Sequence, residues 1–126
     1  PPKVVQFDDP ESPQSLDLLM AALGAEAVDW SGRVDCCGGS LSLTRRDIVR
    51  KLVGEIVAAA EGAGAEAIAT ACPLCFSNLE SRQKGKLPVF YFSELMGLAF
   101  GLKEAGAWFR RHLVSSVALL TRHGLL

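Results

Sequence analysis

The spacing of apolar residues predicts helices in the first half of the chain. Between Thr44 and Glu61 the apolar side chains recur every three or four positions, which is the period of one face of a helix. The residues of this stripe are Ile48, Leu52, Ile56 and Val57. Thr44 suits the N-cap of this helix, with Asp47 in the place of the Glu or Gln of a capping box. A shorter helix is predicted over residues 15–23, because Gly24 follows as a typical C-terminal stop.

Short apolar runs predict strands between and after these helices. The predicted strands cover residues 27–30, 67–71 and 88–92, and residues 4–7 are predicted as a short strand or an extended arm. A helix over residues 73–83 follows the run that ends at position 71, and another helix begins with Ser93 as its N-cap. Strands that alternate with helices indicate an α/β fold, with a small, mostly parallel sheet flanked by helices. In such sheets, functional sites form beyond the C-terminal ends of the strands.

Length and charge narrow the class of protein. The chain has 126 residues, 13.4 kDa and a net charge of −1, so it is long enough for one domain with a core of its own. With 21% charged residues and no basic excess, it does not have the surface of a nucleic-acid-binding protein. We expect no membrane span, because glycines and charges interrupt the most apolar stretch, residues 95–102 and the two that follow. Oxidisable cysteines without an export signal predict a cytoplasmic location.

All four cysteines lie in two tight pairs. Cys36 and Cys37 are adjacent and precede two glycines, whereas Cys72 and Cys75 form a Cys-Pro-Leu-Cys motif at the start of a predicted helix. Each pair follows a predicted strand, so we expect the four sulfurs to lie at the same end of the sheet, within the span of one cofactor.

Three kinds of site are compatible with paired cysteines. A disulfide framework is disfavoured, because such frameworks belong to small secreted chains and a bridge between neighbours such as Cys36 and Cys37 is strained. A thiol redox site at Cys72 and Cys75 is supported by their place at a helix N-terminus, which stabilises thiolates, but it leaves the first pair unexplained. A metal site explains both pairs.

Two metal groups remain as alternatives. A single zinc ion takes four ligands in a tetrahedron, usually from cysteines two to four residues apart, and the adjacent cysteines suit it poorly. An iron-sulfur cluster offers several irons to diverging thiolates, and Gly38 and Gly39 allow the backbone to approach it closely. The cluster is the better physical fit, with zinc as the alternative. The predicted ligands in both cases are Cys36, Cys37, Cys72 and Cys75, and no catalytic residue is assigned.

The residues around both pairs resemble a known family. Residues 36–44 and 71–79 are similar to the cysteine-rich CCG domain found in the B subunit of heterodisulfide reductase, and the likeness extends through residues 1–10, 23–30 and 88–99. The resemblance implies a non-cubane [4Fe-4S] cluster that reduces a thiol–thiol disulfide with electrons from partner iron-sulfur or flavin subunits. Related CCG subunits accompany dehydrogenases. The alternative is therefore a zinc- or cluster-binding electron-transfer or assembly module of a dehydrogenase complex, with no substrate of its own.

The sequence departs from the family pattern in one respect. The resemblance implies a fifth cysteine upstream and a second motif in tandem, whereas no cysteine precedes Cys36 here. We therefore expect residues 1–126 to be a single CCG-type domain, the C-terminal fragment of a longer two-motif subunit. Four of five ligands are present, so we expect the isolated chain to bind metal weakly and to show little disulfide reductase activity.

Several other polar positions have both a structural and a functional interpretation. Asn78, one turn after Cys75, could donate to a cluster sulfide or serve as a surface or capping residue. The pair Arg45 and Arg46 could balance an anionic cluster or form a solvated face. His112 and His123 are predicted to be surface or partly buried residues of a C-terminal helix rather than ligands.

Overall fold

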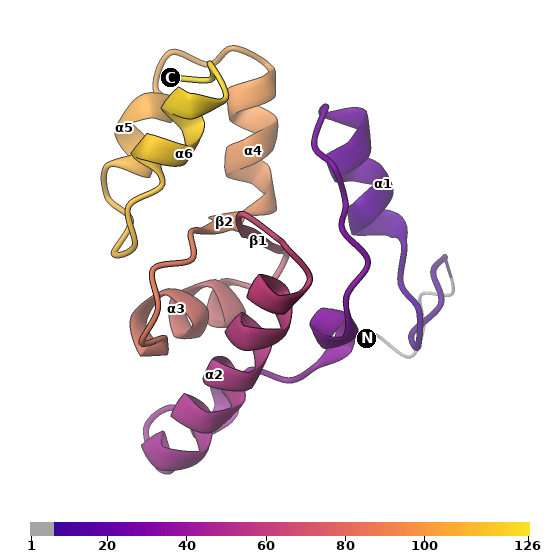
Figure 1. Cartoon of the computed structure of the whole chain (residues 1–126), viewed down its shortest axis with the longest axis vertical. Helices are drawn as coiled ribbons and strands as arrows, with labels where there is room; N and C mark the ends of the chain where they lie inside the picture. The colour runs from indigo at the N-terminus through magenta and orange to yellow at the C-terminus, as the bar shows by residue number, and fades with distance from the viewer. Residues whose placement is uncertain (1–6) are drawn as a thin grey trace.

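The computed structural model describes residues 7–126, so the predicted strand or arm over residues 4–7 lies outside the described residues except for its last position. Within the described part, six α-helices, two strands and two short 3-10 helices succeed one another (Figure 1). The helices are α1 (Ser15–Ala22), α2 (Arg46–Gly62), α3 (Pro73–Arg82), α4 (Phe92–Ala99), α5 (Ala105–Phe109) and α6 (Val117–Arg122). The strands are β1 (Ile68–Thr70) and β2 (Val89–Tyr91), and the 3-10 helices are η1 (Ser31–Val34) and η2 (Gly39–Leu41).

A small parallel sheet lies in the middle of the molecule. β1 pairs with β2 in parallel, with Ile68 opposite Val89 and Thr70 opposite Tyr91, and α3 makes the crossover between them. This confirms the predicted α/β class, the two strands at 67–71 and 88–92, and the helix over 73–83. Figure 1 shows α2 and α3 on one side of the sheet and α4, α5 and α6 gathered on the other.

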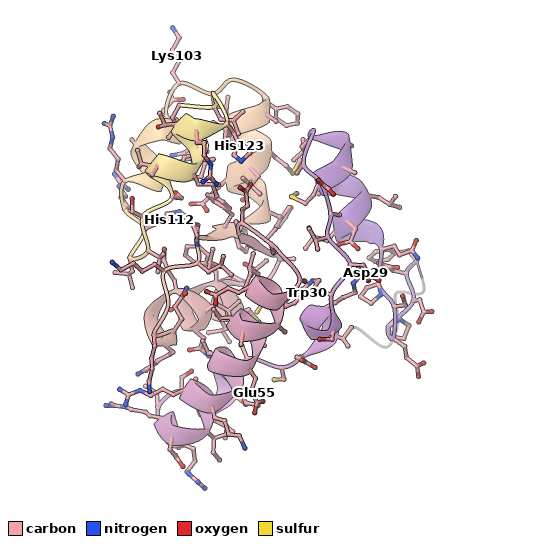
Figure 2. The ribbon with its side chains drawn as sticks, in the orientation of Figure 1. Asp29, Trp30, Glu55, Lys103, His112 and His123 are labelled. Atoms are coloured by element: carbon pink, nitrogen blue, oxygen red, sulfur yellow. The ribbon has the colours of Figure 1, made fainter. Side chains whose placement is uncertain are left out.

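The prediction of a strand over residues 27–30 is wrong. Residues 27 and 29 are exposed and find no ladder partner among the described strands, because the sheet consists of β1 and β2 alone. Instead, the aromatic ring of Trp30 covers the backbone of Gly32, and η1 forms beside it (Figure 2). A Cβ atom at Gly32 would lie 2.4 Å from Cζ3 of Trp30, so the glycine is what allows this packing.

Two hydrophobic clusters form the core. The first joins α2, α3 and the sheet, and it includes Cys37. Its remaining buried members are Val49, Val53, Ile56, Val57, Ala60, Ile68, Leu79, Leu87 and Val89. The second lies on the α4–α6 side and consists of Phe90, Ala105, Phe109 and Leu120. Because neighbouring residues of β2 belong to different clusters, the sheet separates the two halves of the core.

Helix α2 is present as predicted, but its start and its buried face differ. The N-cap is Arg45 rather than Thr44, and Asp47 forms an ion pair of 3.0 Å with the Arg45 guanidinium, so it does not complete a capping box. The buried face centres on Val49 and Val53, one position after the predicted Ile48 and Leu52, which are only half-buried. The spacing of apolar residues alone cannot distinguish the row of Ile48 and Leu52 from the row of Val49 and Val53, because both rows recur with the helical period.

Carboxylates stabilise the starts of α1 and α4. The Asp8 carboxylate accepts the backbone N–H groups of Gln14 (3.0 Å) and Ser15 (2.9 Å) at the start of α1, where no side chain of the N-cap residue does so. Helix α4 begins at Phe92 with Tyr91 as its N-cap, two residues before the predicted N-cap Ser93, and Glu94 accepts the N–H of Tyr91 at 3.0 Å. None of the helices between residues 7 and 126 is both long and apolar enough to cross a membrane.

His112 is not on a C-terminal helix. It lies in the loop between α5 and α6, and its side chain is only 3% exposed, between two glutamates (Figure 2). The residue as a whole is partly buried, as predicted, but its place on a helix was wrongly predicted, and its partners come from α3 and α4, far away in sequence. His123, at the end of α6, has a half-exposed side chain beside Glu66, as predicted for a surface residue.

Candidate metal centre

The first cysteine pair lies in a tight backbone turn against α2. Gly38 has a left-handed backbone (φ +75°), and a Cβ atom there would lie 3.0 Å from Cδ1 of Leu52. Only glycine adopts this conformation at such a close approach without strain. The turn directs Cys37 into the first core cluster, where it is 3% exposed, and leaves Cys36 exposed.

The second pair is carried by the junction between β1 and α3. Cys72 is in an extended conformation at the N-cap, Pro73 occupies the first turn of α3, and Cys75 follows one turn into the helix. Proline fits there because the first turn has no use for its missing N–H. Cys72 is exposed and Cys75 is half-buried. The pair therefore sits at the C-terminal end of a strand, as predicted, whereas the pair at Cys36 follows η1 rather than a strand.

The fold brings one cysteine of each pair into contact. The sulfurs of Cys37 and Cys75, thirty-eight positions apart in the sequence, lie 3.3 Å from one another. The sulfur of Cys36 accepts the N–H of Gly38 at 3.4 Å. All four are free thiols. Their arrangement is a central contact between Cys37 and Cys75, and each pair adds an exposed cysteine to it.

The two cysteines of the second pair differ in acidity. The backbone N–H of Cys75, at the N-terminus of α3, lowers the pKa of Cys72, with a smaller contribution from the N–H of Leu74. Burial raises the pKa of Cys75, and the adjacent thiol of Cys37 raises it further. In the reduced chain Cys72 is therefore the more readily ionised thiol of the pair, and a cation beside Cys75 would be needed to stabilise its ionised form.

A buried amide and a hydroxyl contact the cysteine site. Asn78 of α3 donates from Nδ2 to the sulfur of Cys37 at 3.7 Å, and its Oδ1 accepts the hydroxyl of Ser42 at 2.8 Å. Asn78 is buried, so a surface role is wrong, and its amide contacts a cysteine sulfur, whereas the prediction concerned a cluster sulfide. Ser42 was missed, since nothing in the sequence relates a serine after η2 to an asparagine on α3.

The arginines after the first pair make no contact with the cysteines. Arg45 pairs with Asp47 on the surface, and this partner raises the pKa of the Arg45 guanidinium. Its neighbour Arg46 is exposed at the first position of α2. Among the described residues, the surface positions of Arg45 and Arg46 agree with the interpretation that the two arginines form a solvated face.

The cysteine site offers sulfur donors but no preformed site for one ion. Over residues 7–126, no group of three or more His, Cys, Asp or Glu side chains is gathered closely enough to hold one metal ion. One sulfur of each pair is in contact with the other, and the remaining cysteine of each pair is exposed. Thiolates are the ligands that iron-sulfur clusters take, and the Asn78 amide supplies a donor to one of the sulfurs, as is common around such groups.

Comparison with known proteins agrees with this chemistry. A model of the CCG cysteine-rich domain family matches residues 3–80, which include all four cysteines. The chain is 31% identical to the membrane anchor subunit of the 8-methylmenaquinol:fumarate reductase of Wolinella succinogenes, over 84% of this chain and 41% of that protein. It is 27% identical to the B subunit of the ferredoxin:CoB-CoM heterodisulfide reductase of Methanosarcina mazei, over 97% of this chain and 44% of that protein.

A third relative extends the same group. A protein of Archaeoglobus profundus that resembles the heterodisulfide reductase B subunit is 33% identical over 75% of this chain and 35% of its own length. The chain thus spans less than half the length of these relatives. Since the family match covers more than half of the chain and includes both cysteine pairs, the protein belongs to the CCG cysteine-rich domain family, in which its relatives include the B subunits of heterodisulfide reductases.

Proposed function

We propose that this domain binds a non-cubane [4Fe-4S] cluster and carries electrons within an oxidoreductase of the heterodisulfide reductase type, in the place of the B subunit. The observation that supports this most strongly is the 3.3 Å contact between the sulfurs of Cys37 and Cys75. The contact joins cysteines from separate parts of the chain, and it lies where Cys75 packs against the first core cluster. The family membership and the relatives' names support the same electron-transfer role.

Each cysteine has a distinct part in the proposed ligand set. Cys37 and Cys75 would bind on the inner, buried side of the group, whereas Cys36 and Cys72 would bind at its exposed rim. Cys72 is the most readily ionised ligand of the second pair, because the backbone amides at the N-terminus of α3 stabilise its thiolate. It is therefore the cysteine that we expect to bind metal first.

The chemistry proposed for the complete protein is disulfide reduction. When bound, a cluster supplies electrons one at a time, and two electrons with two protons convert a disulfide into two thiols. The exposed cysteines lie where a small disulfide and an electron-donating iron-sulfur or flavin subunit could both approach. Four unpaired thiols fit a reducing compartment, so we propose a cytoplasmic location.

Metal analysis tests the proposal. The chain is expressed and purified without oxygen, reconstituted with iron and sulfide, and analysed for iron, acid-labile sulfide and zinc, together with its visible absorption. The proposal predicts a brown protein with iron and sulfide in equal amounts, at fewer than four of each per chain because only four of the five family ligands are present. The matched variant Ser77→Ala, which changes a residue of α3 outside the cysteine contacts, should keep this content, and Cys37→Ser should lose it. A colourless protein with one zinc per chain would overturn the cluster.

A second function is supported by one specific comparison. The relative at 31% identity belongs to a fumarate reductase, so a CCG domain also serves in an enzyme with that name. In this alternative, the domain holds zinc or a cluster for electron transfer or assembly and has no substrate of its own. Disulfide reductase activity of the complete complex, measured with a panel of small disulfides, separates the two functions. A cluster that is reduced and reoxidised without consuming any disulfide would favour the alternative.

A further inference from the structure

Asn78 has the geometry of a residue dedicated to one cysteine sulfur. It lies one turn after Cys75 on α3 and is 5% exposed, so its amide must find partners inside the protein. Both ends of the amide do so. Nδ2 lies 3.7 Å from the sulfur of Cys37, and Oδ1 lies 2.8 Å from the hydroxyl of Ser42.

The Ser42 hydroxyl stabilises the amide orientation in which Nδ2 faces the sulfur. An asparagine amide has two donors on nitrogen and acceptors on oxygen, and a hydroxyl that donates to Oδ1 turns Nδ2 toward the opposite side. A thiolate or a metal-bound sulfur accepts hydrogen bonds and cannot donate them, so it repels Oδ1 and attracts Nδ2. The Ser42 contact and the Cys37 contact therefore select the same orientation of Asn78.

The backbone is shaped to allow this contact. Gly39 follows the cysteine pair, and a Cβ atom there would lie 3.6 Å from the Cys37 sulfur, 3.7 Å from Nδ2 of Asn78 and 3.3 Å from Cβ of Leu74. The glycine lets the η2 segment lie directly against α3. Arg82, one turn further along α3, also reaches this segment, and its guanidinium donates to the carbonyl of Ser42 at 3.5 Å. Two residues of one helix thus hold Ser42 in place.

The adjacent cysteines consequently have different surroundings. Cys37 is buried and accepts a side-chain amide, whereas Cys36 is exposed and accepts only the backbone N–H of Gly38 among the hydrogen bonds of the described residues. A donor to a thiolate ligand withdraws charge from the metal group, which makes reduction easier and raises the reduction potential.

We propose that Asn78 is a positioning residue that hydrogen-bonds the Cys37 sulfur, is oriented by Ser42, and raises the reduction potential of the group bound there. The part that concerns the potential rests on the proposed iron-sulfur function. The contact itself is a property of the polypeptide and can be tested without metal.

The potential is tested in the reconstituted protein by an anaerobic redox titration followed by absorption and electron paramagnetic resonance. Asn78→Ala removes the donor and should shift the midpoint to more negative values, with iron content unchanged. Asn78→Asp keeps the shape but places a carboxylate beside the sulfur, so it should shift the midpoint further in the same direction. Ser42→Ala should give a smaller negative shift, Ser42→Thr should retain the wild-type value, and the control Ser77→Ala should have no effect.

The order of these shifts separates hydrogen bonding from packing. A purely structural Asn78 would give a wild-type midpoint in Asn78→Ala at unchanged iron content, and that result would overturn the proposal. Ser42→Ala combined with Asn78→Ala should shift the midpoint no more than Asn78→Ala alone, because both changes remove the same interaction.

A nuclear magnetic resonance experiment on the reduced, metal-free chain tests the contact independently. The side-chain amide signals of Asn78 should move on Cys37→Ala and should exchange faster with solvent on Ser42→Ala, whereas Cys36→Ala should leave them in place. If no iron is incorporated but these signals respond, the proposed function fails and the Asn78 contact stands. If Cys37→Ala does not move the signals, the contact is refuted even in a protein that binds its cluster.

Discussion

Replacing His112 by alanine should cause a large loss of stability, because the imidazole lies between two carboxylates and is itself buried. Its Nε2 is 2.9 Å from Glu94 and its Nδ1 is 3.4 Å from Glu80, and the Glu80 side chain is only 6% exposed. The ring also packs against three aromatic rings at centroid distances of 5.3, 6.0 and 5.7 Å, those of Phe76, Phe90 and Phe109. One side chain thus joins α3, β2, α4 and α5.

The expected loss of stability follows from the groups that remain after the imidazole is removed. Removing the ring leaves a cavity among the aromatic side chains and leaves the two carboxyl groups without their imidazole partner, and losses of this kind together cost about 3–5 kcal/mol. A domain of this size has a free energy of unfolding of about 5–15 kcal/mol, so His112→Ala should remove a third or more of a mid-range value. With a urea m-value of about 2 kcal/mol per molar, the midpoint of unfolding should fall by about 1.5–2.5 M.

His123 provides a matched control. It makes the same kind of contact, 2.8 Å from Glu66, but its side chain is 50% exposed. His123→Ala should therefore lower the free energy of unfolding by no more than about 1 kcal/mol. Both variants are unfolded in urea under reducing, anaerobic conditions and followed by circular dichroism. If the two substitutions lower the free energy of unfolding equally, within about 0.5 kcal/mol, burial of the Glu–His–Glu cluster does not have the importance inferred here.

Three further predictions concern the cysteines, the start of α1 and the glycine turn. In the metal-free chain Cys72 should be alkylated by iodoacetamide at lower pH than Cys75, because its pKa is lowered. Peptide mass spectrometry across a pH series measures both rates. Equal rates would contradict the lowering of the Cys72 pKa by the N-terminus of α3. The backbone amides of Gln14 and Ser15 lower the pKa of Asp8 to about 2, so its contribution to α1 is complete above about pH 4 and is lost as the pH falls through about 2. Hydrogen exchange of α1 amides measures this, and Asp8→Asn should abolish the dependence. Gly38→Ala should destabilise the domain by about 1–3 kcal/mol, because Gly38 has a left-handed backbone. Gly54 lies on α2 with open space around it, so Gly54→Ala should stabilise the domain by about 0.5–1 kcal/mol. Unfolding in urea measures both changes.

Local signals predicted the elements that carry the second cysteine pair. The strand before Cys72 lies in a largely apolar run, and Pro73 marks the first turn of α3, so both elements can be recognised from a few neighbouring residues. The same applies to the strand at 89–91, which pairs with the first through a helical crossover. The family resemblance, too, rests on short runs around the cysteines.

Features that depend on distant partners were not predictable. Residues 27–30 have the composition of a strand, but a strand needs a neighbour, and the sheet of the described residues offers none. The burial of His112 depends on glutamates from α3 and α4, and the role of Ser42 depends on an asparagine thirty-six positions later. Such contacts are decided by tertiary packing, which the spacing of residues in one segment does not contain.

The measurement that tests the central claim most directly is X-ray absorption at the iron edge of the reconstituted chain. If the pairs converge on one cluster, the spectrum should show sulfur ligands and a second iron close to the absorbing one. In the Cys37→Ser/Cys75→Ser double variant, which removes the sulfurs that lie 3.3 Å apart, the iron–iron signal should disappear. A spectrum with a single isolated metal, or an iron–iron signal that survives in the double variant, would contradict the convergence of the two cysteine pairs on an iron-sulfur cluster.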